Sequence, residues 1–210
     1  MKFYYFPAAC SIATHIVLED LGVAFEPCMV DLRAGENQGA AYLTINPSGA
    51  VPALQLDSGE VLTENIAILH WLAESHPGAG LWPASPLQRA QALQWMSRLA
   101  TAFHASARIL WRRERVACSE EANAELQATH RERYLGLLQQ AETRIGTGPW
   151  VLGEEFSIVD AHLFPYVRWA AFWKMDMSVF PNLQAWYARM MERPAVLRAL
   201  EREGQPLKLS

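Results

Sequence analysis

The sequence predicts a small mixed α/β domain followed by an all-helical domain. Over the first 75 residues, short strand-like runs alternate with runs of helical spacing. A stretch rich in Gly and Pro follows at 76–86, and beyond it every periodic segment has helical spacing. We therefore predict a first domain over 1–77, a linker over 78–86 and a helical domain over 87–210.

The first domain begins with a strand over 2–6, KFYYF, which is rich in aromatic residues. Apolar residues recur with an approximately helical period over 11–21, and Gly22 suits the position just after a helix. A second strand is predicted over 25–32, and Pro27 places it at an edge of the sheet because proline cannot donate to a strand ladder.

The rest of the first domain continues with a loop over 33–40 and a short helical turn over 41–44. Two short antiparallel strands, 53–56 and 61–62, flank a Ser-Gly turn, and a helix then runs to about residue 75. The predicted order is therefore βαβ followed by ββα.

The second domain contains only predicted helices. One long helix over 87–115 carries an apolar stripe of Leu93, Met96, Ala100, Phe103, Ala107 and Leu110. A second helix spans 120–145, and a third begins at Ser157, where Ser157 and Asp160 have the spacing of a capping box. Two last helices, 181–192 and 194–203, each open with a proline.

The composition excludes several classes of protein. The chain has 210 residues, of which 51% are hydrophobic and 19% charged, with a net charge of −4. No basic stripe indicates nucleic-acid binding, and no apolar run is long enough for a membrane span or a signal peptide. The three cysteines are far apart and lack metal-ligand spacing, so we expect no metal and a reducing, cytoplasmic location.

Cys10 is the first candidate for chemistry, because it directly precedes a predicted helix. N–H groups at a helix start favour the thiolate, and such positions lower a cysteine pKa from about 8.5. The alternative from the residues alone is a small buried hydrophobic side chain. The sequence continues as Cys-Ser-Ile-Ala, so no second thiol follows at the spacing of a dithiol oxidoreductase.

Several motifs together resemble the cytosolic glutathione S-transferases over nearly the whole chain. They are NPSGAVPAL, LTENIAILHWLAE and the SIVDA box of the helical domain, and PAACSIATHI with LATAFHAS is most similar to the bacterial beta class. The resemblance implies a thioredoxin-like first domain, a helical-bundle second domain, a homodimer, glutathione as co-substrate and a role in detoxification.

The resemblance also implies the glutathione-binding residues. Val51 and Pro52 are expected to form a cis peptide, with the main chain of Val51 pairing with the tripeptide as an added strand would. Glu64 and Asn65 open a helix whose free N–H groups suit the γ-glutamyl carboxylate, although Asn65 stands where many relatives have a small hydroxyl residue. Cys10 and His104 are expected to lie beside the glutathione sulfur.

For catalysis, the resemblance implies that Cys10, Ser11 and His104 hold the glutathione thiol as thiolate. The competing candidate is a tyrosine of the first strand, Tyr4 or Tyr5. Two departures from close relatives, Ser97 and Ala105, put the contacts to the glycine carboxylate in doubt, and Arg108 or Arg112 are candidates to compensate. Trp169, Phe6 and Pro7 are expected to line the pocket of the hydrophobic substrate, with Phe172 or Trp173 as further candidates.

The leading hypothesis is therefore a glutathione transferase that promotes attack of the glutathione thiolate on hydrophobic electrophiles. Two alternatives stay open. One is glutathione-dependent thiol–disulfide exchange through Cys10. The other is a binding protein that holds glutathione or hydrophobic ligands without turnover.

Overall fold

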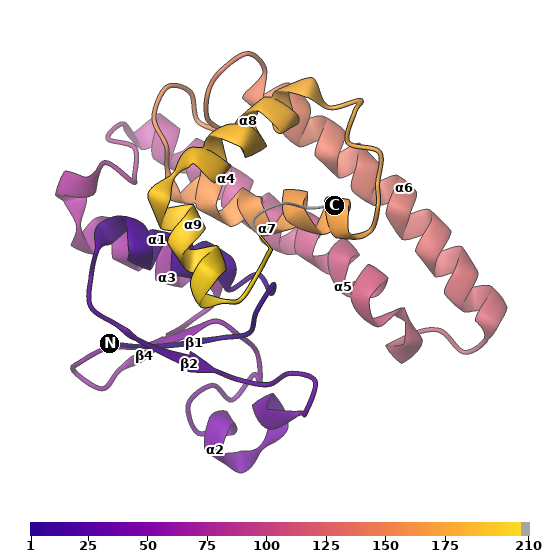
Figure 1. Cartoon of the computed structure of the whole chain (residues 1–210), viewed down its shortest axis with the longest axis horizontal. Helices are drawn as coiled ribbons and strands as arrows, with labels where there is room; N and C mark the ends of the chain where they lie inside the picture. The colour runs from indigo at the N-terminus through magenta and orange to yellow at the C-terminus, as the bar shows by residue number, and fades with distance from the viewer. Residues whose placement is uncertain (207–210) are drawn as a thin grey trace.

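The computed structural model describes residues 1–206 and confirms a thioredoxin-like domain followed by a helical domain (Figure 1). Residues 207–210, the end of the predicted helical domain, lie outside the described residues. The sheet has the order β2-β1-β3-β4, with β1 parallel to β2 and antiparallel to β3, and β3 antiparallel to β4. Its strands are β1 (Lys2–Tyr5), β2 (Glu26–Met29), β3 (Ala53–Gln55) and β4 (Val61–Thr63).

Strand β2 lies at the edge of the sheet, as its proline predicts, and Pro27 stands opposite Phe3. The strand is shorter than the predicted 25–32. After Met29 only one further main-chain bond to β1 forms, from the N–H of Val30 to the carbonyl of Tyr5, before the chain turns into the loop.

Three helices and two short 3-10 turns complete the first domain. They are α1 (Ile12–Leu21), η1 (Glu36–Gln38), α2 (Ala40–Leu43), α3 (Asn65–Ser75) and η2 (Pro77–Ala79). Helices α1 and α3 contact each other and α7 of the second domain. Helix α2 lies on the far side of the strands from these helices (Figure 1).

Strand β1 shows why two hydrophobic clusters form. Successive side chains of a strand point to opposite faces. Phe3 and Tyr5 therefore enter the main core, while Tyr4 packs against the smaller cluster of Val30, Tyr42 and Val51 on the other face. The smaller cluster holds the loop that carries Val51 against the sheet.

The predicted long helix is present but contains a wider turn. It runs through α4 (Pro86–Arg98), η3 (Leu99–His104), which has π-helical geometry, and α5 (Ala105–Arg112), and it ends in the 3-10 turn η4 (Arg113–Arg115). The predicted apolar stripe is wrong at two positions. Leu93 is exposed and Ala100 lines a cavity, and the buried stripe is Ala92, Met96, Leu99, Phe103, Ala107 and Leu110.

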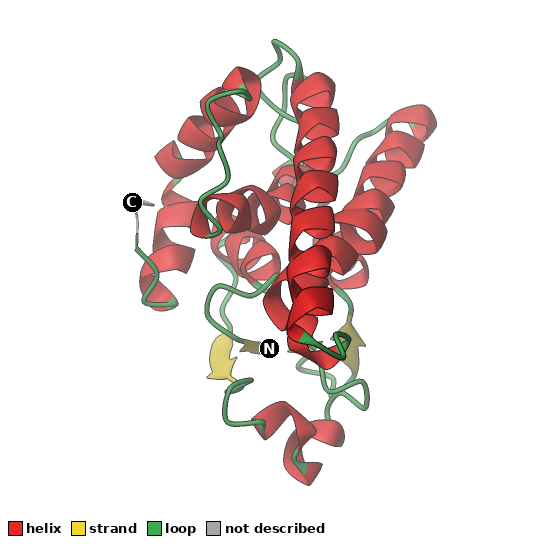
Figure 2. Ribbon diagram, turned by 90° about the vertical axis from the view of Figure 1, so that its right-hand side faces the viewer, coloured by secondary structure: helices red, strands yellow, loops and turns green. Residues whose placement is uncertain are grey.

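Four further helices form the rest of the second domain, which fills the upper part of Figure 2 above the strands. They are α6 (Glu120–Ile145), α7 (Ile158–Phe172), α8 (Pro181–Glu192) and α9 (Pro194–Arg202). The predicted capping box of Ser157 and Asp160 is confirmed at the start of α7. Asp160 also accepts hydrogen bonds from the N–H of Val151 and from Trp186 Nε1, so it joins α7 to its neighbours. None of the described helices combines the length and the apolar character that a membrane span requires.

Charged residues join α1 to α9. The Arg198 and Arg202 guanidinium groups lie 2.9 and 3.1 Å from the carboxylate of Glu19, which is only 6% exposed. Deeper in the interface, His15 Nδ1 lies 3.0 Å from the carboxylate of Glu203. These contacts fix the first domain against the end of the second. No local pattern predicts them, because each pair is separated by more than 170 residues.

Candidate active site

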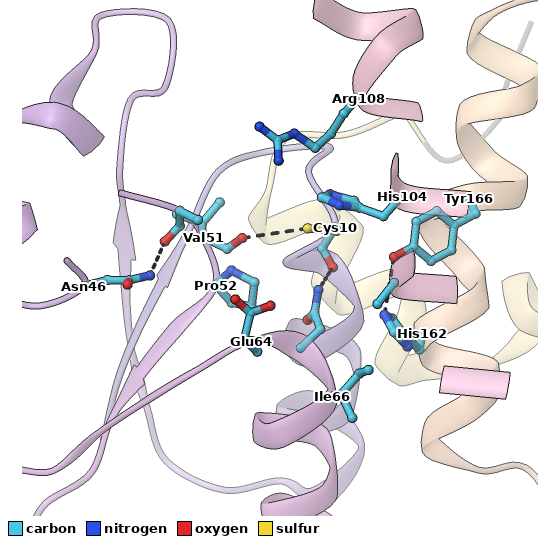
Figure 3. Close-up of a pocket in the computed structure, with 13 residues that line it drawn as sticks. Cys10, Asn46, Val51, Pro52, Glu64, Ile66, His104, Arg108, His162 and Tyr166 are labelled. Carbon is cyan, nitrogen blue, oxygen red and sulfur yellow. Dashed lines mark hydrogen bonds between the residues drawn. The ribbon is translucent and has the colours of Figure 1, made fainter. Parts of the chain in front are cut away.

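A cavity of about 200 Å³ lies between the first domain and the helical segments η3, α5 and α7. Figure 3 shows side chains from both domains facing it. It is lined by Cys10, Asn46, Ala50, Val51, Pro52, Glu64, Asn65, Ile66, Ala100, His104, Arg108, His162 and Tyr166. The predicted glutathione-binding residues are all among them, whereas Ser11, Phe6, Pro7 and Trp169 are not.

Cys10 lies at the side of the cavity that belongs to the first domain, just before α1. Its thiol points to the carbonyl oxygen of Val51, 3.7 Å away. Burial raises the pKa of the Cys10 thiol to about 12, although N–H groups of Cys10 and Ser11 act to lower it. The prediction of a thiolate favoured by the helix start is therefore wrong for this structure, because desolvation outweighs the helix start. Cys10 is a neutral thiol and a hydrogen-bond donor.

The turn before Cys10 is held by the second domain. Ala8 has a positive φ of 62°, which is uncommon for a residue other than glycine. Its N–H donates to the Glu203 carboxylate at 3.1 Å, and its carbonyl accepts from Trp169 Nε1 at 2.8 Å. The helical domain thus fixes the conformation that presents Cys10 to the cavity.

The NPSGAV loop delivers Val51 to the cavity. Its Ala50 carbonyl accepts hydrogen bonds from Asn46 Nδ2 at 2.7 Å and from the Tyr42 hydroxyl at 2.6 Å. Gly49 has φ +60°, and a Cβ built on it would lie 2.5 Å from Gln38 Nε2, so the turn requires glycine. The expected cis peptide between Val51 and Pro52 is present.

This loop leaves polar main-chain groups of Val51 for a ligand. The Val51 N–H has no hydrogen-bond partner among residues 1–206, and its carbonyl has only the weak thiol donor of Cys10. A peptide main chain offers the complementary donor and acceptor.

The start of α3 forms the base of the cavity in the view of Figure 3. Glu64 has φ 68° and ψ 124°, a strained conformation, and its side chain lines the cavity. Asn65 is buried, and its side chain is already used, since its amide donates to the Cys10 carbonyl and its oxygen accepts from Thr14. The Asn65 side chain therefore fixes α3 against the Cys10 turn, and the predicted contact of Asn65 with glutathione stays a prediction. The first N–H groups of α3 have no partner within the helix, and Asn65 and Ile66, its first two residues, line the cavity.

His104 is the last residue of the π-helical segment η3 and faces the cavity. Wide π turns often occur at functional sites. Burial lowers the pKa of His104, and the charge of Arg108 lowers it further. The imidazole is therefore neutral near pH 7, with one N–H donor and one acceptor nitrogen.

Tyr166 and His162, one turn apart on α7, line the cavity on the side of the helical domain, to the right of Cys10 in Figure 3. The Tyr166 hydroxyl lies 3.3 Å from His162 Nε2. Burial raises the pKa of Tyr166 well above its usual value and lowers the pKa of His162 to about 3. Both side chains are therefore neutral. The sequence analysis did not predict either residue as part of the site, because both lie in a helix that is otherwise largely apolar. Their polar atoms, four residues apart on that helix, were the one feature that could have indicated a site.

The sequence of the chain was compared with models of protein families and with known proteins. The N-terminal and C-terminal domain models of glutathione S-transferases match residues 9–75 and 91–194. Glutathione S-transferase GstA of Escherichia coli O157:H7 is 36% identical over 206 residues, which cover 97% of this chain and 99% of that protein. The chain belongs to the glutathione S-transferase family.

Two solved structures of the family extend the similarity. A glutathione transferase homolog from Sulfitobacter with bound glutathione is 32% identical, covers 98% of both chains and superposes with a TM-score of 0.90. A beta class glutathione S-transferase of Sphingomonas chungbukensis is 38% identical, covers 98% of this chain and 100% of that one, and has a TM-score of 0.84. Glutathione transferase is accordingly the enzyme class of this chain.

Ser11 of this transferase does not reach the cavity. The residue is fully buried, and its hydroxyl donates to the carbonyl of Phe6 at 3.2 Å. The hydroxyl also lies 3.3 Å from the N–H of Phe6, so it closes the turn before Cys10 from within. The structure thus places Ser11 in the turn before Cys10 rather than at the cavity, and its predicted catalytic role stays a prediction.

The tyrosines of the first strand are also absent from the cavity lining. Tyr5 is 8% exposed and stacks on Phe3 in the core. Tyr4 packs edge to face on Tyr42, and its hydroxyl lies 3.4 Å from Gln55 Oε1. Neither supports the competing prediction of a tyrosine beside the ligand sulfur.

The aromatic residues expected for the second substrate form a cluster next to His104 rather than part of the cavity itself. The Trp169 ring lies 6.1 Å from the His104 ring, and Trp111 and Trp173 extend the cluster outward. Trp111 is 46% exposed. Phe6 packs instead with the smaller hydrophobic cluster, under the guanidinium of Arg33.

Ser97 and Ala105 are both exposed and do not line the cavity. Across residues 1–206, no cluster of three or more His, Cys, Asp or Glu side chains has the arrangement of a metal site.

Proposed function

We propose that this glutathione transferase binds glutathione in an extended form along Val51 and at the start of α3. The observation that carries the proposal is the pair of main-chain groups of Val51 at the cavity, beside the thiol of Cys10. The γ-glutamyl carboxylate meets the first N–H groups of α3, and Glu64 accepts from the γ-glutamyl ammonium.

In this arrangement the glutathione sulfur lies among neutral hydrogen-bond donors. The Cys10 thiol and the Tyr166 hydroxyl both keep their protons at neutral pH, because burial raises both pKa values. Donors that keep their own protons stabilise a neighbouring thiolate, so the glutathione thiol is the group that ionises. Neutral His104 either donates to that thiolate or accepts its proton. The thiolate then attacks an electrophilic carbon.

The electrophile is a hydrophobic molecule that binds beside the buried Trp169, between the Phe6–Pro7 turn and the exposed face of Trp111. The support for this position is the contact of the Trp169 cluster with His104, which places apolar surface next to the sulfur. Detoxification by conjugation follows from such a substrate.

We place the enzyme in the beta class, which Cys10 and His104 at one cavity and the likeness to a beta class structure support. We further propose a cytoplasmic homodimer with the domains 1–77 and 87–210 joined by the linker 78–86. Exposed Leu87 and Leu93 on α4 suit a surface that a second copy covers, since they are 70% and 43% exposed.

Thiol–disulfide exchange through Cys10 remains the second candidate, because the thiol itself lines the cavity. The experiment measures two activities of Cys10→Ala and of the protein with Cys10. One is conjugation of glutathione to an aryl halide, and the other is thiol–disulfide exchange with a glutathionylated substrate. We expect conjugation to fall by about tenfold, the loss of one hydrogen bond to a charged group, and exchange to be abolished.

The background for both assays is Cys28→Ala with Cys118→Ala, which removes the two thiols outside the cavity. Conjugation that disappears together with Cys10 would show that this thiol does more than donate one hydrogen bond to the thiolate. If the background protein, which keeps Cys10, showed neither activity but still bound glutathione, the result would favour a binding protein without turnover.

A further inference from the structure

His162 is buried at the cavity, and one of its two ring nitrogens lacks a partner. The residue belongs to the cavity lining and is only 1% exposed. Its Nε2 lies 3.3 Å from the Tyr166 hydroxyl, whereas its Nδ1 is buried without a hydrogen-bond partner among residues 1–206. In the proposed function Tyr166 donates to the glutathione sulfur, whereas His162 has no task.

The position of the imidazole proton decides what the Tyr166 hydroxyl can donate to. A neutral imidazole carries one proton, on either Nδ1 or Nε2. With the proton on Nδ1, a buried N–H is left without an acceptor, and the bare Nε2 takes the hydroxyl proton of Tyr166. With the proton on Nε2, this N–H donates to the hydroxyl oxygen, and the hydroxyl proton is free to point to a ligand.

We propose that His162 is a positioning residue, which donates from Nε2 to the Tyr166 hydroxyl and thereby directs the hydroxyl proton to the glutathione sulfur. The inference rests on the proposed function. With a thiolate bound, this tautomer forms two hydrogen bonds, one of them to a charged atom. The other tautomer forms one and turns the lone pairs of the hydroxyl oxygen to the anion. Accepting a hydrogen bond also polarises the hydroxyl, which strengthens its own donation.

The packing of α7 leaves the hydroxyl proton as the part of Tyr166 that is free to turn. The Tyr134 hydroxyl donates to the main-chain carbonyl of Tyr166 at 2.9 Å. The Tyr166 ring packs edge to face on Trp169, with 5.3 Å between the ring centroids. In Figure 3 the hydroxyl end of this ring points toward Cys10. The ring is therefore fixed by its neighbours, and His162 sets the direction of the proton.

The surroundings of the pair supply few competing charges. The titratable and charged groups beside the pair or elsewhere at the cavity are Cys10, Glu64, His104, Arg108 and Tyr134. Burial keeps Cys10, His104 and Tyr134 neutral near pH 7, because it raises the pKa of the thiol and of the phenol and lowers that of the imidazole. Hydrogen bonds are therefore the means by which His162 and Tyr166 act on the sulfur.

The first test measures the tautomer of His162 directly. The nitrogen-15 chemical shifts of an imidazole distinguish a protonated from a bare ring nitrogen. The wild type, labelled at its histidines and bound to glutathione, gives these shifts, and the signal that is lost in His162→Gln belongs to His162. We expect the proton on Nε2. A proton on Nδ1 would overturn the proposal, and the measurement on wild type does not depend on the folding of a core variant.

The second test is a double-mutant cycle on the pKa of the bound glutathione thiol, measured by the ultraviolet absorbance of thiolate in Cys28→Ala with Cys118→Ala. We expect Tyr166→Phe to raise this pKa by about one unit, the loss of one hydrogen bond to a charged atom, and His162→Leu to raise it by about half a unit. The double variant should match Tyr166→Phe alone, because His162 acts through the hydroxyl. His162→Gln, whose amide can donate in place of Nε2, should stay close to wild type.

The matched control is Tyr134→Phe, which removes a buried hydroxyl from the main chain of Tyr166 but leaves the contact between Tyr166 and His162. It should keep the wild-type pKa of the bound thiol. Additive shifts in the double variant, or an equal shift in Tyr134→Phe, would show that looser packing of α7 is the cause and would overturn the proposal. A wild type that does not bind glutathione would instead contradict the proposed function itself.

Discussion

The two walls of the cavity are built in different ways. The main-chain wall (Val51, Pro52 and the start of α3) presents backbone groups, and its side chains are used to hold those groups in place, as with Asn65. The helical wall (His104, Arg108, His162 and Tyr166) presents side chains, three of them neutral and partly or fully buried.

This difference assigns separate tasks to the two walls. Backbone groups are the same in every residue, so the main-chain wall suits a ligand recognised by its own peptide bonds. Neutral donors in a desolvated surrounding stabilise a charge that develops on a ligand atom, so the helical wall suits the sulfur. Binding should therefore fail first when the main-chain wall is changed, and chemistry when the helical wall is changed.

The largest loss of stability is expected when Asp160, which anchors the helical wall to its neighbours, is replaced. Asp160 is fully buried and accepts hydrogen bonds from Ser157, Val151 and Trp186. Asp160→Ala leaves these donors without a partner, and we expect it to lower the free energy of unfolding by about 3 kcal/mol or more.

Urea denaturation measures this loss. Asp176→Ala is the control, since this exposed carboxylate bonds only within its own turn at Ser178. Equal stability of the two variants would contradict the anchoring role of Asp160.

His162 should give the helical wall a characteristic pH dependence. Its pKa is about 3 in the folded protein and about 6.5 when unfolded, so the unfolded chain binds the extra proton between these values. The stability that neutral His162 contributes is complete above pH 6.5 and is lost as the pH falls below it, by about 2 kcal/mol at pH 5.

Denaturation of wild type and His162→Gln at pH 7.5 and pH 5 tests this slope. The variant should lose about 2 kcal/mol less than wild type over that interval. If His162→Gln kept the wild-type slope, the account of a buried neutral imidazole would be wrong.

A smaller effect is expected from the main-chain wall. Gly49→Ala introduces a Cβ 2.9 Å from the Asn37 carbonyl oxygen at φ +60°, and the loop must shift to accommodate it. We expect glutathione to bind about fivefold more weakly, with little change in the rate of conjugation at saturating glutathione.

The matched control is Gly35→Ala, which has φ +78° but nothing within 4 Å of the added Cβ. It carries a similar backbone strain without disturbing the loop of Val51. A fall in the saturated rate for Gly49→Ala, with unchanged affinity, would show that the two walls do not divide the work in this way.

The same comparison explains what the sequence could predict. The main-chain wall comes from contiguous motifs, NPSGAVP and TEN, in which spacing and turn residues specify the geometry locally. The order of the elements and the capping box at Ser157 follow from local patterns too, and the structure confirms them.

The helical wall depends on contacts that no local pattern carries. Ala92 and Leu93 lie four and three residues before Met96, so helical periodicity alone could not decide that Ala92 is the buried one. The Tyr166 hydroxyl reaches the cavity only because the tertiary fold packs α7 next to the turn of Cys10. The state of Cys10 was mispredicted for a related reason, because desolvation depends on the tertiary packing around the thiol, whereas the helix start is visible in the sequence.

The central claim is that the glutathione sulfur, and not Cys10, is the thiol that ionises at this site. The direct measurement is the ultraviolet absorbance of thiolate as a function of pH, in Cys28→Ala with Cys118→Ala, with glutathione or S-methylglutathione bound. We predict a thiolate signal with glutathione alone, at a pKa about one unit or more below the usual thiol value of about 8.5, and none below pH 9 with S-methylglutathione. A thiolate signal at neutral pH in the S-methylglutathione complex, or a bound glutathione thiol with an unchanged pKa, would contradict the account.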